Sequence, residues 1–334
     1  MLRGSHIPLV LAMLALTGCA GLKVGRVTPS SVQEAAAYSA KRGERALIIL
    51  RAGEVLLERG DTRKDFPVYS ITKSVAALGA LEGAGAGWLS LGIAAASEIT
   101  VWREDPDARR IRVEDLLSQT SGLPPASRQL YGGRPADVRA RAVALRPVKP
   151  PGRIFDYGPS HYEALGAVLE RKLKTRGIPV ETWVRRQVLA PMGITAGPRW
   201  RKDGRGQVYL STGLELSASD LVALAGYMMS DSGGLILPVR GVPANPLYAR
   251  GFWLNRNAAA GKTEIDVEDA IDRVKPGGWG RYCLSRQAPA DLTAMVGSFG
   301  QRVYVSRSRG LVVARLGRSS AFRDPEFLRR LFAL

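Results

Sequence analysis

The chain has 334 residues, of which 46% are hydrophobic, and its 48 Lys and Arg residues outnumber its 30 Asp and Glu residues to give a formal net charge of +18. This length allows one large domain or two smaller ones with a sizeable core. A positive charge can indicate binding to nucleic acid or to an anionic membrane. Here the basic residues are spread from Arg3 to Arg330, without a long block or a recognisable nucleic-acid-binding motif. We therefore favour a generally basic surface and expect no nucleic-acid partner.

The first residues have the features of an export signal. Arg3 precedes an apolar stretch over 7–16 that is too short to span a bilayer comfortably. Leu16-Thr17-Gly18-Cys19 follows, and it resembles the bacterial lipobox, in which small residues precede a Cys that becomes lipidated. The alternative is an ordinary signal peptide with an incidental Cys.

We predict a lipoprotein signal peptide over residues 1–18, lipidation of Cys19 and a short tether over 19–30. This would place the protein in the cell envelope, anchored to a membrane through lipid. Ala20, rather than Asp, gives no argument for inner-membrane retention. We therefore expect the outer membrane, with the protein facing the periplasm.

Few cysteine and histidine residues remain after such a signal is removed. Cys283 would be the one free thiol and His161 the one imidazole. An intramolecular disulfide and a Cys/His zinc site are therefore excluded, and we expect neither a metal nor another cofactor. A Ser-His-Asp triad would have to use His161.

In chain order, the apolar pattern predicts strands near both ends and helices between them. A first helix is expected over 31–41, a hairpin over 46–50 and 55–58, and further helices over 71–82, 111–117, 162–174, 180–188 and 217–229. Extended segments are expected over 251–254, near 284 and 295, and over 301–306 and 311–315, before a terminal helix over 326–334. This order predicts an α+β fold. A sheet subdomain (about 31–80 and 245–334) would surround an inserted, mainly helical subdomain (about 81–244).

Ser70 and Lys73 are the first candidates for chemistry. Three residues are close to one helical turn, so both side chains would lie on one face of the helix predicted from residue 71. A serine hydroxyl needs a base to become a nucleophile, and a lysine supplies one if its pKa is lowered, to which the positive end of the helix dipole would contribute. No other Lys has a Ser three residues before it. The alternative is a helix start with a solvated lysine.

Several stretches in this order resemble the serine beta-lactamase-like family, especially the branch that contains class C enzymes, penicillin-binding-protein-like hydrolases, esterases and aminohexanoate-oligomer hydrolases. The matching stretches are the hairpin at 46–60, Ser70-Ile-Thr-Lys73, Leu116 to Pro124, Pro151 to Tyr157, Ser217 to Leu221 and Gly297 to Gln301. The resemblance covers residues 31–334. It implies a beta-lactamase/transpeptidase-like fold, with an antiparallel sheet flanked by helices and an inserted helical domain.

The resemblance also implies roles for individual residues. Ser70 would attack an ester or amide carbonyl to form an acyl-enzyme, and Lys73 and Tyr157 would share the work of the general base. The backbone N–H groups of Ser70 and Ser298 would form the oxyanion hole. Which of Lys73 and Tyr157 is the dominant base stays open at this point.

Two departures from the family pattern bear on the substrate. Pro159 stands where the family's Tyr-x-Asn motif has Asn, and the third motif has no Lys-Thr-Gly, because Lys262-Thr263 is followed by Glu264 and lies elsewhere. We therefore favour an ester or amide hydrolase over a true beta-lactamase or D,D-peptidase, with a small-molecule or peptide substrate. A catalytically impaired envelope-binding protein is the alternative, and the oligomeric state stays open. Candidate substrate contacts are Ser160, His161, Trp253, Gly297 and Gly300, although we weigh His161 more towards a structural role.

Overall fold

A computed structural model describes residues 24–133, 135–195, 199–230 and 240–334. The predicted signal peptide, Cys19 and the first part of the tether lie outside the described residues. The main sheet has seven strands in the order β2-β1-β11-β10-β9-β6-β5, and all its neighbours pair antiparallel. Its strands are β1 (Glu44–Arg51), β2 (Glu54–Gly60), β5 (Tyr248–Ala249), β6 (Phe252–Leu254), β9 (Thr293–Gly297), β10 (Gln301–Ser306) and β11 (Leu311–Gly317).

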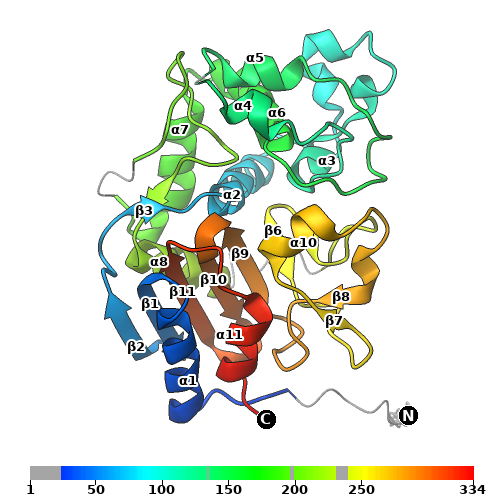
Figure 1. Cartoon of the computed structure of the whole chain (residues 1–334). Coiled ribbons are helices and arrows are strands. Elements are labelled where there is room, and N and C mark those ends of the chain that lie inside the picture. The colour runs from blue at the N-terminus through cyan, green and yellow to red at the C-terminus, as the bar shows by residue number, and fades with distance from the viewer. Residues whose placement is uncertain (1–23, 134, 196–198, 231–239) are drawn as a thin grey trace, which may run out of the picture.

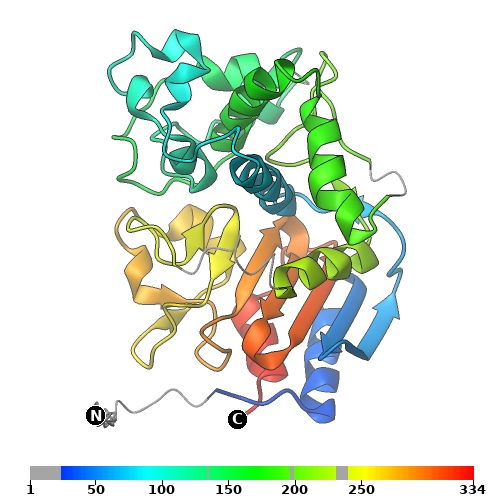
Figure 2. The ribbon, with the colours of Figure 1, turned by 180° about the vertical axis from the view of Figure 1, so that it is seen from behind.

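Helices cover both faces of this sheet. The first and last helices, α1 (Pro29–Ala40) and α11 (Asp324–Leu331), lie side by side on one face (Figure 1). Helix α8 (Ala218–Met229) packs on β10 and β11 from the opposite face, which Figure 2 shows from behind. Every residue of β10 and β11 is buried. Polar residues on these strands, such as Arg302 and Arg315, are therefore buried and need partners inside the protein.

A second group of helices stands above the sheet in Figure 1, with α2 (Ile71–Gly85) between the two layers. Helix α6 is buried on nearly all sides over its first two turns, so even its polar residues there need partners inside the protein. Besides α2, the group consists of α3 (Val113–Leu117), α4 (Ser127–Tyr131), α5 (Val138–Val143), α6 (Ser160–Lys174) and α7 (Val180–Val184). A π-helical turn (Arg185–Leu189) extends α7.

A third region, yellow to orange in Figure 1, lies beside β6 and β9. It contains α10 (Val267–Arg273) and the strand pair β7 (Thr263–Glu264) and β8 (Tyr282–Cys283). A second short pair, outside this region, joins β3 (Phe66–Pro67) to β4 (Glu215–Leu216). Aromatic side chains join this region to the loop before α6: the Phe155 ring lies 5.3 Å from the Trp279 ring and 5.1 Å from the Tyr248 ring. The loop that leads to Tyr157 is thereby fixed against this region.

The predicted α+β class is confirmed, and so are most of the elements. Most boundaries differ from the prediction by a few residues. Helix α2 continues past residue 82 to Gly85, and Gly83 lies against the Trp88 ring, where a Cβ would come within 2.5 Å. The extended segment predicted near 284 is β8, and the terminal helix predicted over 326–334 runs from Asp324 to Leu331. Helices α4, α5 and α10 were not predicted. Within the described residues, no helix has the length and apolarity needed to cross a membrane.

Candidate active site

Ser70 and Lys73 lie together at the start of α2, as the spacing predicts. Ser70 is the N-cap residue of the helix and is partly exposed, whereas Lys73 is 2% exposed. The Lys73 Nζ donates hydrogen bonds to the Ser70 Oγ at 2.9 Å and to the Ser211 carbonyl oxygen at 2.9 Å. The amine is therefore held on the nucleophile from the protein side, while Ser70 itself is partly exposed.

Tyr157 joins this pair from the loop before α6. The Lys73 Nζ lies 4.8 Å from the centre of the Tyr157 ring, and the Ser70 side chain is close enough to Tyr157 to act on the pKa of its hydroxyl. Gln119 holds the loop: its Oε1 accepts from the Gly158 N–H at 2.9 Å, and its carbonyl accepts from the Asp156 N–H at 3.0 Å. The structure therefore brings Ser70, Lys73 and Tyr157 into one cluster from two distant parts of the sequence.

Burial moves the pKa values of the two bases in opposite directions. Loss of solvent lowers the pKa of Lys73 to about 7, and the carboxylate of Glu163 opposes this shift. Burial also raises the pKa of Tyr157 to about 12, against a smaller effect of the Ser70 side chain. At neutral pH the Lys73 amine is thus partly deprotonated, whereas Tyr157 keeps its proton.

The segment with Ser298 lies against the segment with Ser70. A Cβ on Gly297 would come within 2.3 Å of the Val68 carbonyl oxygen, so glycine permits this close approach. Tyr69 (φ 48°) and Phe299 (φ 62°) both have left-handed backbones, and their rings lie 5.1 Å apart. Such conformations cost about 1–3 kcal/mol each and persist only where the surroundings enforce them. Phe299 is 44% exposed, so this aromatic pair forms a lip beside the nucleophile.

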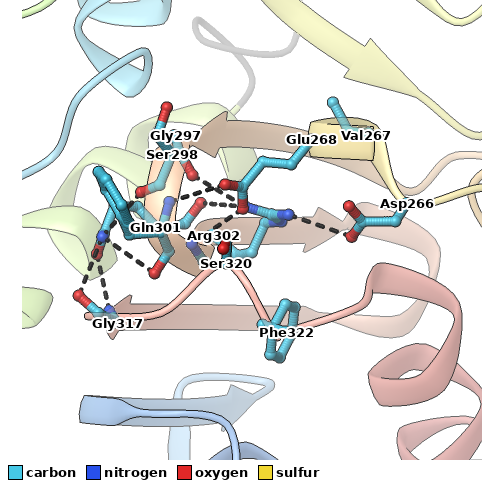
Figure 3. A network of polar contacts seen from close by, with 12 residues as sticks. Asp266, Val267, Glu268, Gly297, Ser298, Gln301, Arg302, Gly317, Ser320 and Phe322 are labelled. Atoms are coloured by element: carbon cyan, nitrogen blue, oxygen red, sulfur yellow. Dashed lines mark hydrogen bonds and ion pairs between the residues drawn. The ribbon is translucent and has the colours of Figure 1, made fainter. Parts of the chain in front are cut away.

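Glu268 of α10 and Arg302 of β10 support the turn at 298–300 (Figure 3). The Glu268 carboxylate accepts from the Phe299 N–H at 2.8 Å and from the Gly300 N–H at 3.0 Å, and it pairs with Arg302 at 3.2 Å. The Gln301 amide donates to the Ser298 carbonyl at 3.0 Å and accepts from the Gly317 N–H at 2.8 Å. These contacts fix the backbone that carries Ser298.

All five of the predicted substrate contacts are buried in the protein. His161 is 0% exposed, and its Nδ1 and Nε2 are bonded to the Ser121 Oγ at 2.8 Å and the Asp156 carbonyl at 2.7 Å. Burial lowers the pKa of His161 to about 3, so it is neutral. Ser160 is also fully buried and donates to the Pro124 carbonyl at 2.6 Å. Both ring nitrogens of His161 are engaged away from Ser70, so it forms no triad with Ser70.

Trp253, Gly297 and Gly300 are the other three buried candidates. Trp253 is 1% exposed and packs among aromatic side chains, while a Cβ on Gly300 would come within 2.4 Å of the Arg315 Nη1. We correct the prediction accordingly: Ser160, His161, Trp253 and Gly300 support the site from the interior, and Gly297 provides close backbone packing.

Sequence reasoning missed three residues next to Lys73. Glu163 is fully buried on α6, Ser211 is fully buried in the loop before β4, and the Tyr131 hydroxyl lies 2.7 Å from the Ser211 Oγ. A charged residue within the apolar first turns of α6 is the one signal that could have pointed to Glu163. Nothing local in the sequence marks Ser211, because it reaches Lys73 through its backbone carbonyl.

A family model described as Beta-lactamase matches residues 34–320, so the chain belongs to that family and the resemblance is confirmed. No curated protein matches the chain. Solved structures share the fold at low sequence identity. EstCE1, "a hydrolase with promiscuous acyltransferase activity", is 16% identical with a TM-score of 0.62, over 91% of this chain and 99% of its own.

Two further solved structures are bacterial enzymes of the same fold. A class C beta-lactamase from Rhodobacter sphaeroides is 14% identical with a TM-score of 0.63, over 91% of this chain and 97% of its own. A beta-lactamase/D-alanine carboxypeptidase from Yersinia pestis is 16% identical with a TM-score of 0.63, over 91% of this chain and 96% of its own. The family and these neighbours support a serine hydrolase in general terms.

Proposed function

We propose that this protein is a serine hydrolase that forms an acyl-enzyme at Ser70 on an ester or amide substrate. One observation carries the proposal: the Lys73 Nζ lies 2.9 Å from the Ser70 Oγ, and burial holds the pKa of that amine at about 7. A general base is most effective when its pKa lies near the working pH. Lys73, rather than the neutral Tyr157, is therefore the dominant base.

The steps follow from the contacts around Ser70. The neutral Lys73 amine takes the Ser70 proton while the Oγ attacks the carbonyl carbon. The N–H groups of Ser70 and Ser298 stabilise the oxyanion. Tyr157 donates its proton to the leaving oxygen or nitrogen and regains one from the Lys73 ammonium. Water then attacks the acyl-enzyme, with Lys73 as base, to release the acid and the free serine.

The basic residue beside the third motif is not available to bind the carboxylate of a beta-lactam, and a simple ester or amide needs no such group. Arg302 lies on the strand directly after this motif, but it is fully buried and paired with Asp324 at 2.6 Å and with Glu268 at 3.2 Å. Pro159 also offers no amide side chain to a substrate. Both features support an esterase or amide hydrolase.

We propose that the enzyme works in the cell envelope, anchored through lipid on Cys19. The Leu16-Thr17-Gly18-Cys19 stretch behind an apolar segment supports this location. In cells fed a labelled fatty acid, Cys19→Ser should abolish lipid labelling and membrane association. A variant that is still lipidated would contradict the anchor.

A hydrolysis screen tests the activity. Acyl esters, amino-acid amides, D-amino peptides and beta-lactams are offered to the protein and to Ser70→Ala. We expect turnover of one or more esters or amides that is lost in Ser70→Ala. Turnover that survives Ser70→Ala would overturn the proposal. Absence of turnover with every class would favour the alternative, an envelope-binding protein on the same fold, for which Pro159 in the second motif is the motivating feature.

A further inference from the structure

A carboxylate lies buried behind Lys73. Glu163 is 0% exposed on the first turn of α6, and its two oxygens face the loop before β4. They accept from the Ser211 N–H at 2.9 Å, from the Leu210 N–H at 3.3 Å and from the Ser211 hydroxyl. All three donors belong to two consecutive residues, so Glu163 fixes this loop at one point.

The same point holds Lys73. Ser211 donates from its N–H and hydroxyl to the Glu163 carboxylate, and its carbonyl accepts from the Lys73 Nζ at 2.9 Å. Tyr131 contacts the Ser211 Oγ at 2.7 Å from the other side. Since Ser211 is itself fully buried, these bonds face no competition from solvent. One residue therefore connects the carboxylate to the amine that serves Ser70.

Shape alone does not explain a charged residue here. A buried carboxylate is costly, and an amide of the same size would keep the bonds from Ser211 and lose only the long bond from the Leu210 N–H, without carrying a full charge. Arg139 is the cation of α5 that influences Glu163, but its Nη1 is paired with Glu170 at 2.8 Å. The negative charge thus needs a further reason, and the Lys73 amine across Ser211 offers one.

We propose that Glu163 is a positioning residue for Lys73. Through Ser211 it holds the amine on the Ser70 hydroxyl, and its negative charge favours the ammonium that forms when Lys73 takes the Ser70 proton. This inference rests on the proposed function, because it gives Glu163 a role in the acylation step of that reaction. Glu163 does not touch Ser70 and exchanges no proton in this scheme.

Several charged and titratable groups act on this pair. Lys73 of α2 is surrounded by Tyr157, His161 and Glu163, and Glu163 is faced by Tyr131 of α4 and Arg139 of α5.

Burial lowers the pKa of Lys73, and the Glu163 carboxylate raises it. Burial raises the pKa of Glu163, while the bonds from Ser211 and the charge of Arg139 lower it. Removing the carboxylate should therefore lower the pKa of Lys73 further.

The test compares wild type with Glu163→Gln by the rate at which a fluorophosphonate labels Ser70, measured from about pH 5 to about pH 9. We expect the maximal labelling rate to fall roughly tenfold, because a base with a lower pKa is weaker. The acid limb of the profile should move to lower pH, while the probe concentration for half-maximal rate changes little. A merely structural role would lower the amount of active protein without moving the limb.

Two more variants keep the test decisive. Glu163→Asp keeps the charge, so its acid limb should stay close to that of wild type even if its rate falls. Ser211→Ala removes one bond to Glu163 but keeps the carbonyl that receives Lys73, so we expect a smaller shift in the same direction. Glu181→Gln is the matched control: it removes a surface carboxylate paired with Arg185 and Lys202, and its profile should equal that of wild type.

The outcomes separate the two claims. If Glu163→Gln folds and labels Ser70 with the rate and acid limb of wild type, the role of Glu163 is overturned while the serine hydrolase stands. If Glu163→Gln does not fold, a Ser211→Ala profile identical to that of wild type overturns it. If wild type itself is not labelled at Ser70, the proposed function fails.

Discussion

The helical side and the sheet side of the candidate site differ in the number and type of their charged groups. On the helical side, one amine, Lys73, faces one carboxylate, Glu163, across a single residue, and the pKa of the amine lies at about 7. On the sheet side, Arg302 is surrounded by three carboxylates, those of Asp266, Glu268 and Asp324. The first side can change its protonation near neutral pH, while the guanidinium of the second cannot.

This difference separates the groups that take part in proton transfer from the groups that hold the backbone in place. A base must gain and lose a proton in each turnover, so its environment must leave both forms accessible. The turn that carries Ser298 must instead stay in place, and a permanent cation held by several carboxylates gives it that rigidity. Mutations on the helical side should therefore alter rate and pH dependence, whereas mutations on the sheet side should first alter stability or geometry.

The largest expected effect on activity comes from Lys73→Ala. Without the amine, the Ser70 hydroxyl has no neighbouring base except the neutral Tyr157, so kcat/KM should fall about 10²–10⁴-fold. Steady-state hydrolysis of a substrate found in the screen measures this. Lys172→Ala, which removes an ion pair with Glu98 in the same helical group, should leave kcat/KM unchanged. Equal losses in both variants would contradict the assigned base.

Arg302→Met should have the largest effect on stability. It leaves the fully buried Asp324 and the buried Asp266 without their cation, which costs about 3–5 kcal/mol in comparable buried pairs. Denaturant unfolding measures this loss. The control is Arg110→Met at an exposed ion pair with Asp107, where about 0–1 kcal/mol is expected. Equal losses of unfolding free energy in the two variants would contradict the structural role assigned to Arg302.

Glu268→Gln tests whether the sheet side of the site affects the rate without affecting the pH dependence. An amide cannot accept from the Phe299 and Gly300 N–H groups with both of its polar atoms, so the turn that carries Ser298 should loosen. We expect kcat to fall roughly tenfold, a fraction of the loss seen when an oxyanion donor is removed outright. The acid limb of the pH profile should stay in place, unlike that of Glu163→Gln. A displaced limb would show that the two sides are not separate.

The pH dependence of wild type follows from Lys73. Below its pKa of about 7 the amine is protonated and cannot accept the Ser70 proton, so kcat/KM should fall on the acid side with a midpoint near pH 7. This pKa lies below the ordinary value of 10.5, so between the two values the unfolded state binds more protons than the native state. The contribution of Lys73 to stability should therefore rise with pH from about 7 to 10.5. Thermal unfolding of wild type and Lys73→Met across this range isolates it, and equal slopes would contradict a lowered pKa.

The smallest effect is expected at the aromatic lip. Phe299→Ala removes the ring that contacts Tyr69 and should change KM for esters with apolar acyl groups by an amount equivalent to about 0.5–1.5 kcal/mol. It should leave kcat for a short acyl ester nearly unchanged. A large loss of kcat for both esters would mean that the ring positions Ser298 rather than the substrate.

The sequence predicted the fold class and the cluster of Ser70, Lys73 and Tyr157 because family motifs and apolar patterns are local signals. It did not predict Glu163 and Ser211 as partners of Lys73, since their contact depends on how α6 packs against a loop almost fifty residues later. It also offered Ser160 and His161 as substrate contacts. The first turns of α6 prove to be buried on nearly all sides, which sequence periodicity does not reveal for a short stretch.

Covalent labelling of the nucleophile, in which the Ser70 Oγ displaces fluoride from a fluorophosphonate, tests the central claim most directly. The protein is incubated with a fluorophosphonate at about pH 8, above the pKa of Lys73 of about 7, and the peptide that carries Ser70 is analysed by mass spectrometry. We predict one adduct on Ser70 in wild type, none in Ser70→Ala and a strongly slowed adduct in Lys73→Ala. An adduct on another residue, or labelling of Ser70 that is equally fast without Lys73, would contradict the assignment of Ser70 as nucleophile and Lys73 as its base.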